Sequence, residues 1–348
     1  MKSLNIPVGV SDFTEIRQNG YYYIDKSGLI KDILETTSTK VTLITRPRRF
    51  GKTLAMSMLD AFFDIRKESK KLFEGLEISK QQDLCAKWMN RYPTVFVSFR
   101  QVEGLDFAGA YDMLTVVIAN LFNKHIYLLD SKKATEFQKK SFRQLLSANA
   151  SVKEVKSSIE LLMNMLYDYY DKPVILLIDE YDVPLAKANE NGYYDEMVLL
   201  IRNLFENGLK TNKSLKFAIL TGCLRVAKES IFTGLNNFKI YSITDKSFDE
   251  TFGFTDNEVR ELLKYYGQEE YYEIVKAWYD GYRFGDVEVY CPWDVINFCS
   301  DHRTDPGLAP KNYWANTSGN SVISHFIDSV GKPQKLTRME LEQLVNGG

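Results

Sequence analysis

One stretch decides the fold of this chain: Thr45-Arg46-Pro47-Arg48-Arg49-Phe50-Gly51-Lys52-Thr53. It follows residues 41–44, an aliphatic and β-branched run that predicts a buried strand, and precedes residues 54–63, whose apolar side chains fall on one helical face. A strand, Gly-Lys-Thr and a helix in that order are the context that a phosphate-binding loop requires. The sequence therefore predicts a loop that holds phosphates at the N-terminus of a helix.

Each residue of such a loop has an expected role. Lys52 would place its charge between the β- and γ-phosphates of a nucleotide, and the Thr53 hydroxyl would ligate Mg²⁺. We expect the nucleotide to contact Arg46, Pro47, Arg48, Arg49, Phe50, Gly51, Lys52, Thr53 and Leu54. The implied cofactors are ATP and Mg²⁺.

The loop departs from the pattern G-x-x-x-x-G-K-[ST] at its first position, where Arg46 replaces glycine. Arg46 lacks the permissive φ of glycine, and Pro47 offers no amide to a phosphate. We therefore expect the loop to bind phosphate with fewer backbone donors and to make up the charge with Arg48 or Arg49.

A second motif supports the first. Residues 174–178 are aliphatic without alternation, which predicts a strand buried on both faces of a parallel sheet, and Asp179 and Glu180 follow directly. Ligands bind at this end of the strands in open α/β sheets. We expect Asp179 to hold Mg²⁺ and Glu180 to orient and deprotonate the attacking water. The alternative is that these carboxylates only cap the next helix.

Three further residues are candidates for sensing or neutralising the γ-phosphate. Residues 215–220 predict another buried strand, and Thr221 ends it where a group that senses phosphate or positions water is expected. Arg225 follows closely and could neutralise charge in the transition state, or it could be an ordinary surface charge. Arg283, in an aromatic-rich turn, could reach the nucleotide from the C-terminal part, or it could be a structural arginine stacked on neighbouring rings.

The order of elements predicts the architecture. A strand and helices separate the loop from the Asp-Glu strand, and further strands follow it. This is the order of the additional-strand P-loop ATPases of the ASCE or AAA-like type, with a parallel sheet of order 5-1-4-3-2. We expect residues 1–245 to form the ATPase core with an N-terminal lead-in. Residues 246–348 are expected to form a helical lid or a winged-helix-like subdomain.

Composition narrows the class of protein. The chain has 348 residues, of which 45% are hydrophobic, and a net charge of −2, so it is globular and offers no electrostatic argument for nucleic acid or membrane as a partner. Its four cysteines show no C-x-x-C spacing, which favours reduced thiols. The N-terminus lacks the apolar segment of a signal peptide, and no run is long enough to span a membrane. We expect a cytoplasmic protein and leave its oligomeric state open.

These motifs resemble those of the bacterial AAA-ATPase-like family over essentially the whole chain. The segments that carry the resemblance are Ile6-Pro7-Val8-Gly9, Tyr22-Tyr23-Ile24-Asp25-Lys26, the loop at 45–53, Leu177-Ile178-Asp179-Glu180-Tyr181-Asp182, Leu220-Thr221-Gly222-Cys223-Leu224-Arg225, Thr233-Gly234-Leu235-Asn236-Asn237 and Trp278-Tyr279-Asp280-Gly281-Tyr282-Arg283-Phe284-Gly285. In that family Arg-Pro-Arg-Arg-Phe-Gly-Lys-Thr is the usual loop. Typical members continue into a nuclease-like domain of the PD-(D/E)XK class, whose core we do not find here.

Three functions remain for comparison. The first is a Mg²⁺-dependent ATPase that controls an attached or partner domain, which could be the nuclease-like domain or a separate protein. The second is a nucleotide-dependent signalling switch with little turnover. The third is the ATPase module of a nucleic-acid-processing protein, which the near-neutral charge places last.

Overall fold

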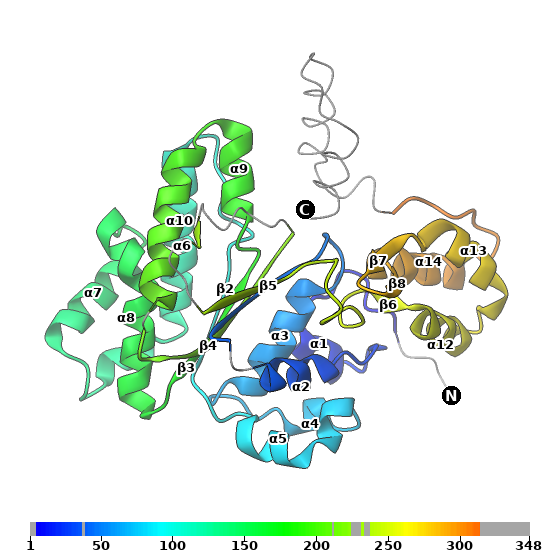
Figure 1. Cartoon of the computed structure of the whole chain (residues 1–348), viewed down its shortest axis with the longest axis horizontal. Helices are drawn as coiled ribbons and strands as arrows, with labels where there is room; N and C mark the ends of the chain where they lie inside the picture. Colours follow the sequence, from blue (N-terminus) through cyan, green and yellow to red (C-terminus); the bar gives the residue numbers. More distant parts are fainter. Residues whose placement is uncertain (1–4, 37–38, 211, 224–230, 233–236, 314–348) are drawn as a thin grey trace.

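The computed structural model describes residues 5–36, 39–210, 212–223, 231–232 and 237–313. Five parallel strands form the central sheet in the order β2-β3-β4-β1-β5, which is the order 5-1-4-3-2 expected from the sequence (Figure 1). Their bounds are β1 Val41–Thr45, β2 Thr94–Ser98, β3 Val174–Asp179, β4 Leu215–Gly222 and β5 Phe238–Tyr241. β1 and β3 are buried along their whole length, as their aliphatic composition predicts.

Helices cover both faces of the sheet (Figure 1). One face packs against α6 Phe107–Asn123, η2 Ile126–Asp130, α7 Glu136–Leu146, α8 Val152–Tyr170, α9 Val183–Asn191 and α10 Tyr194–Leu209. The other face packs against α1 Phe13–Gln18, α2 Gly28–Glu35, α3 Lys52–Phe63, α4 Lys70–Phe73, η1 Glu77–Lys80 and α5 Gln82–Trp88. This arrangement leaves the carboxyl ends of the strands open for a site.

A smaller unit of helices and short strands follows the sheet, in the region where the sequence predicted a helical lid or a winged-helix-like subdomain. Its helices are α12 Asp256–Tyr266, η3 Glu269–Tyr271, α13 Tyr272–Tyr279 and α14 Pro292–Thr304. They accompany a three-stranded antiparallel sheet of β6 Phe254–Thr255, β8 Val287–Tyr290 and β7 Tyr282–Phe284, in that order. We call residues 254–313 the C-terminal unit. The strands are two to four residues long and were therefore not visible as a sequence pattern.

The C-terminal unit and the sheet share part of one core. Phe248 and Phe252, from the segment between β5 and β6, are buried together with Phe284 of β7 against the face of the sheet that carries α3. The segment between α1 and α2 also packs onto the unit, where Tyr22 contacts the rings of Tyr265 and Tyr266. The unit is thus held from two directions.

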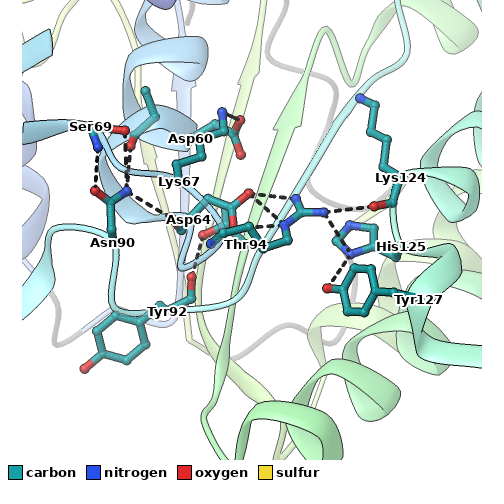
Figure 2. A network of polar contacts seen from close by, with 12 residues as sticks. Asp60, Asp64, Lys67, Ser69, Asn90, Tyr92, Thr94, Lys124, His125 and Tyr127 are labelled. Carbon is teal, nitrogen blue, oxygen red and sulfur yellow. Dashed lines mark hydrogen bonds and ion pairs between the residues drawn. The ribbon is translucent and has the colours of Figure 1, made fainter. Parts of the chain in front are cut away.

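The far end of α3 is fixed by a polar network around Asp64 and Arg66 (Figure 2). Asp64 is fully buried, and its carboxylate accepts from Arg66 Nε (3.1 Å) and Nη2 (2.7 Å). The same guanidinium donates to the Lys124 carbonyl (3.0 Å) and lies 3.4 Å from His125 Nδ1. Burial and the neighbouring Arg66 and Lys124 charges lower the pKa of His125 to about 3, so its ring stays neutral.

We expect Arg66→Met to destabilise the protein by about 2 kcal/mol, because it leaves the buried Asp64 carboxylate without its charged partner. Urea denaturation followed by circular dichroism measures this change. Because Arg66 follows the C-terminal end of α3, twelve residues along the helix from the phosphate loop, ligand binding is expected to be unchanged. An unchanged free energy of unfolding would contradict the role given to the network.

Candidate functional site

A cavity of about 530 Å³ opens at the carboxyl ends of the strands. Its lining comes from the loop before α3, from Glu180 after β3, from Cys223 after β4 and from Arg100 after β2. The lead-in and the C-terminal unit complete the wall. The cavity therefore lies where ligands bind in open α/β sheets.

The loop before α3 presents the N-terminus of a twelve-residue helix to this cavity. Gly51 is the N-cap residue of α3 and has φ of +83°, a left-handed conformation that glycine adopts without strain. The loop residues that line the cavity are Arg48, Arg49, Phe50, Gly51, Lys52, Thr53 and Leu54. A helix N-terminus with its unpaired amides and positive dipole end suits an anion.

Lys52 lies in the first turn of α3 and is 6% exposed. Its ammonium donates to the carbonyl oxygens of Arg46 (2.9 Å) and Pro47 (2.8 Å) and to Cys223 Sγ (3.3 Å). These contacts hold the cation in the hollow of the loop, so it is positioned to meet an anionic group in the cavity.

Asp179 connects three of the predicted site residues. It ends β3 fully buried, and its Oδ2 accepts from the Thr53 hydroxyl (2.7 Å) while its Oδ1 accepts from the Thr221 hydroxyl (2.6 Å). The parallel register that joins β3 to β4 brings these side chains to one edge of the sheet. Thr221 itself is buried and faces Asp179 rather than lining the cavity.

The oxygens gathered here fit a magnesium ion. Thr53 and Asp179 supply a hydroxyl and a carboxylate, the hard ligands that Mg²⁺ takes alongside waters and phosphates. Within the described part of the chain, no group of three or more His, Cys, Asp or Glu residues could hold a metal by itself. A site of this kind therefore suits Mg²⁺ that arrives with phosphate oxygens.

Glu180 lines the cavity in a left-handed conformation, with φ of +52°. Such values are uncommon for residues other than glycine and concentrate at functional sites. Burial and the adjacent Asp179 charge raise the pKa of Glu180, whereas Lys52 and Arg100 act in the opposite direction. The N-cap position of α9 is held by Asp182, so neither Asp179 nor Glu180 occupies it.

The strand-end positions next to the predicted residues hold groups that the sequence reasoning missed. Cys223 follows β4 and contacts Lys52, and its amide donates to Asp182 Oδ2 (2.9 Å). Arg100 follows β2 and lines the same cavity as Glu180. Gly222 lets β4 pass close to the Tyr181 ring, since a Cβ there would lie 2.4 Å from that ring. The sequence signal that could have found Cys223 and Arg100 is their position just after the end of a predicted strand.

Two arginines lie elsewhere than predicted. The side chain of Arg46 is fully buried behind the loop, and neither Arg46 nor Pro47 lines the cavity in which nucleotide was expected to contact them. Arg283 lies in β7, largely exposed, with Nε donating to the Gly285 carbonyl (3.3 Å). It is outside the cavity because β7 directs it to solvent. Arg225 falls outside the described residues.

The other half of the cavity is apolar and aromatic. It is lined by residues of the lead-in and of the C-terminal unit: Ile6, Pro7, Tyr22, Ile24, Leu262, Tyr266, Trp293 and Ile296. An apolar region beside an anion-binding helix terminus matches a ligand with a flat ring system at one end and phosphates at the other.

A five-stranded parallel sheet flanked by helices, with this cavity at its strand ends, defines an α/β protein with an AAA-like P-loop fold. The particular family follows from comparison with known proteins. The chain belongs to the AAA-ATPase-like family, whose model, described as "Predicted AAA-ATPase", matches residues 7–232. Membership of this family implies nucleotide binding.

A curated relative shares 27% identity with this chain over 321 residues. It is the "Uncharacterized protein in vnfD 5'region" of Azotobacter chroococcum mcd 1. The match covers 91% of this chain and 55% of the relative, so the chain spans about half the length of that protein. Among the described residues, no helix combines the length and the apolar character that crossing a membrane requires.

Proposed function

We propose that this protein is a Mg²⁺-dependent ATPase of the additional-strand P-loop type. The observation that carries the proposal is the buried Asp179 carboxylate, which joins the hydroxyl of Thr53 to that of Thr221 beside the N-terminus of α3. Lys52 and Glu180 face the same cavity. A cation, a hydroxyl and two carboxylates at one helix terminus are the parts that phosphoryl transfer to water needs.

Each residue has a distinct role in this reaction. Lys52 neutralises charge on the β- and γ-phosphates, and the amides at the start of α3 donate to phosphate oxygens. Thr53 and Asp179 hold Mg²⁺, which supplies charge neutralisation when bound. Glu180 accepts the proton of the attacking water. Thr221 orients Asp179 through its hydroxyl, so we assign it a positioning role.

The apolar half of the cavity accommodates the adenine base. Tyr22 of the lead-in and Trp293 of the C-terminal unit line that half from opposite parts of the chain. A base held there contacts both, so nucleotide binding favours one placement of the C-terminal unit as a lid. The cycle could control an attached or partner domain through this unit.

A second candidate is a nucleotide-dependent switch with little turnover. The observation that favours it is the shared lining of the cavity, because residues of the phosphate loop and of the C-terminal unit face the same space and a bound nucleotide could set the placement of that unit without turnover. Phosphate release at saturating ATP and Mg²⁺, measured beside a titration of a fluorescent ATP analogue, distinguishes the two functions. Tight binding without turnover supports the switch, and absence of binding contradicts both.

We expect Arg48→Ala to weaken ATP binding by roughly tenfold, because one charge-assisted contact to phosphate contributes about 1.5 kcal/mol. Arg48 and Arg49 both line the cavity, but the Arg49 guanidinium is engaged by the Trp293 ring, whose centre lies 4.2 Å away. Arg48 is therefore the better candidate to supply the charge that the loop lacks. Isothermal titration calorimetry with ATP measures the change, and equal affinities of Arg48→Ala and wild type would exclude this role.

A further inference from the structure

Arg46 stands where the loop pattern has glycine, yet its guanidinium is occupied by the protein itself. Nη1 donates to the carbonyl oxygens of Thr45 (2.8 Å) and Tyr241 (3.3 Å), at the ends of β1 and β5. Nη2 donates to the carbonyl oxygens of Ser247 (3.4 Å) and Phe248 (3.0 Å). These last two residues lie in the segment that leads from β5 to the C-terminal unit. One side chain therefore joins two strand ends to that segment.

The same guanidinium lies against two rings. Its carbon is 5.5 Å from the ring centre of Phe252 and 5.0 Å from that of Phe284, a residue of β7 in the C-terminal unit. Within the described residues, no carboxylate lies within ion-pair distance of Arg46 and its Nε has no hydrogen-bond partner. Carbonyl oxygens and aromatic faces thus fix the guanidinium, and the Asp245 and Asp249 carboxylates act on its charge from beyond ion-pair distance.

The backbone of Arg46 faces the other way, toward the phosphate site. Its carbonyl accepts from Lys52 Nζ (2.9 Å), and its amide donates to the Gly222 carbonyl (3.1 Å) at the end of β4. A displacement of Lys52 toward a phosphate would therefore act directly on Arg46. The residue contacts the phosphate-binding lysine with its main chain and the C-terminal unit with its side chain.

Two other residues of the loop also contact the C-terminal unit. The Phe50 ring is fully buried and packs edge-on against Tyr282 (4.8 Å between centroids) and against Phe284 (5.1 Å). Arg49 stacks on Trp293 of α14. Arg46, which replaces the first glycine of the pattern, and two residues at its variable positions thus all contact the C-terminal unit.

We propose that Arg46 is a positioning residue that fixes the phosphate loop against the C-terminal unit, so that nucleotide in the loop sets the placement of that unit. This inference rests on the proposed function, because it requires the loop to bind nucleotide. It gives Arg46 a task that glycine could not perform, since glycine has no side chain to reach the carbonyls or rings.

The test compares Arg46→Gly, which restores the loop pattern, and Arg46→Lys with wild type in the full chain. Hydrogen–deuterium exchange is followed with and without MgATP in peptides covering residues 46–55 and 282–290. In wild type we expect ATP to slow exchange in both segments. In Arg46→Gly we expect ATP affinity to fall roughly tenfold. At saturating ATP, residues 46–55 should stay protected and residues 282–290 should lose their ATP-dependent protection. Arg46→Lys keeps the charge but not the planar fork, so it should restore affinity more than protection.

Arg66→Met is the matched control, because it also removes an arginine that donates to a backbone carbonyl, but at the far end of α3. It should lower stability and leave ATP-dependent protection intact. Phe284→Leu removes the ring that Arg46 and Phe50 contact while it keeps every residue of the loop. It should reproduce the loss of protection, which provides a second test if Arg46→Gly does not fold.

Two outcomes separate this inference from the proposed function. If Arg46→Gly binds ATP as wild type does and residues 282–290 keep their protection, Arg46 does not position the unit. The same conclusion follows if ATP protects only residues 46–55 in wild type. If ATP protects neither segment of the wild-type protein, the proposed function fails, and this inference fails with it.

Discussion

Lys52→Ala is expected to lower ATP affinity by roughly 100-fold or more and to remove turnover, since a buried ammonium with charge-assisted bonds to phosphate contributes about 3 kcal/mol. Lys52 is 6% exposed at the start of α3, and it is held by the carbonyls of Arg46 and Pro47. Alanine cannot replace its charge in the loop. Equilibrium titration with a fluorescent ATP analogue and a phosphate-release assay measure both effects.

Lys67→Ala is the control for this substitution. Lys67 follows the other end of α3, where its ammonium pairs with Asp60 and lies away from the cavity. We expect this variant to bind and hydrolyse ATP as wild type does. Wild-type ATPase activity in Lys52→Ala would end the assignment of the loop as the catalytic phosphate site.

Much of the fold could be predicted because its signals are local. The continuous aliphatic runs of β1 and β3 are buried throughout, and residues 45–53 form the connection between β1 and α3 that they predict. The α12 helix begins at a capping box of Thr255 and Glu258, as its sequence indicates. Signals of this kind depend on residues three or four apart and need no knowledge of the tertiary structure.

The structure differs from the sequence predictions where residues distant in the sequence determine the position of a side chain. Nothing near Arg46 in the sequence shows that its guanidinium meets carbonyls of residues 241 and 248, about 200 positions away. Arg283 has aromatic neighbours in the sequence, but the short strand β7 turns its side chain outward. The conformation of Glu180 is likewise set by its surroundings, since no local pattern predicts a positive φ for glutamate.

The residues of the site also divide into those that local sequence patterns predict and those that depend on tertiary packing. Lys52 and Thr53 open α3, Asp179 ends β3 and Glu180 follows it, so their places depend on elements whose sequence patterns are strong. Cys223 and Arg100 reach the same cavity from loops, where side-chain direction depends on packing. Residue type and position at strand ends therefore predicted the four residues expected to carry out ATP hydrolysis. The neighbouring residues Cys223 and Arg100 could be identified only from the structure.

Glu180→Gln should separate binding from hydrolysis. The amide keeps the size of the side chain and the left-handed backbone position but cannot accept a proton from water, so we expect turnover to fall by roughly 100-fold or more. ATP affinity should stay the same or increase, because a negative charge is removed from the phosphate cavity. Single-turnover hydrolysis and ATP titration measure the two quantities, and Glu180→Asp tests whether a carboxylate withdrawn by one methylene still supports turnover.

The pH dependence of wild type identifies the group that acts. Burial and the Asp179 charge raise the pKa of Glu180. Its basic form is therefore lost at a higher pH than that of an ordinary glutamate, whose pKa is about 4.3. Turnover should therefore decline on acidification from neutral pH while ATP binding persists, and the residual activity of Glu180→Gln should lack this decline. If both proteins lose activity in parallel as the pH falls, another group is the base. The position of Arg100 beside Glu180 would then have to be explained by phosphate binding rather than by an effect on the pKa of the carboxylate.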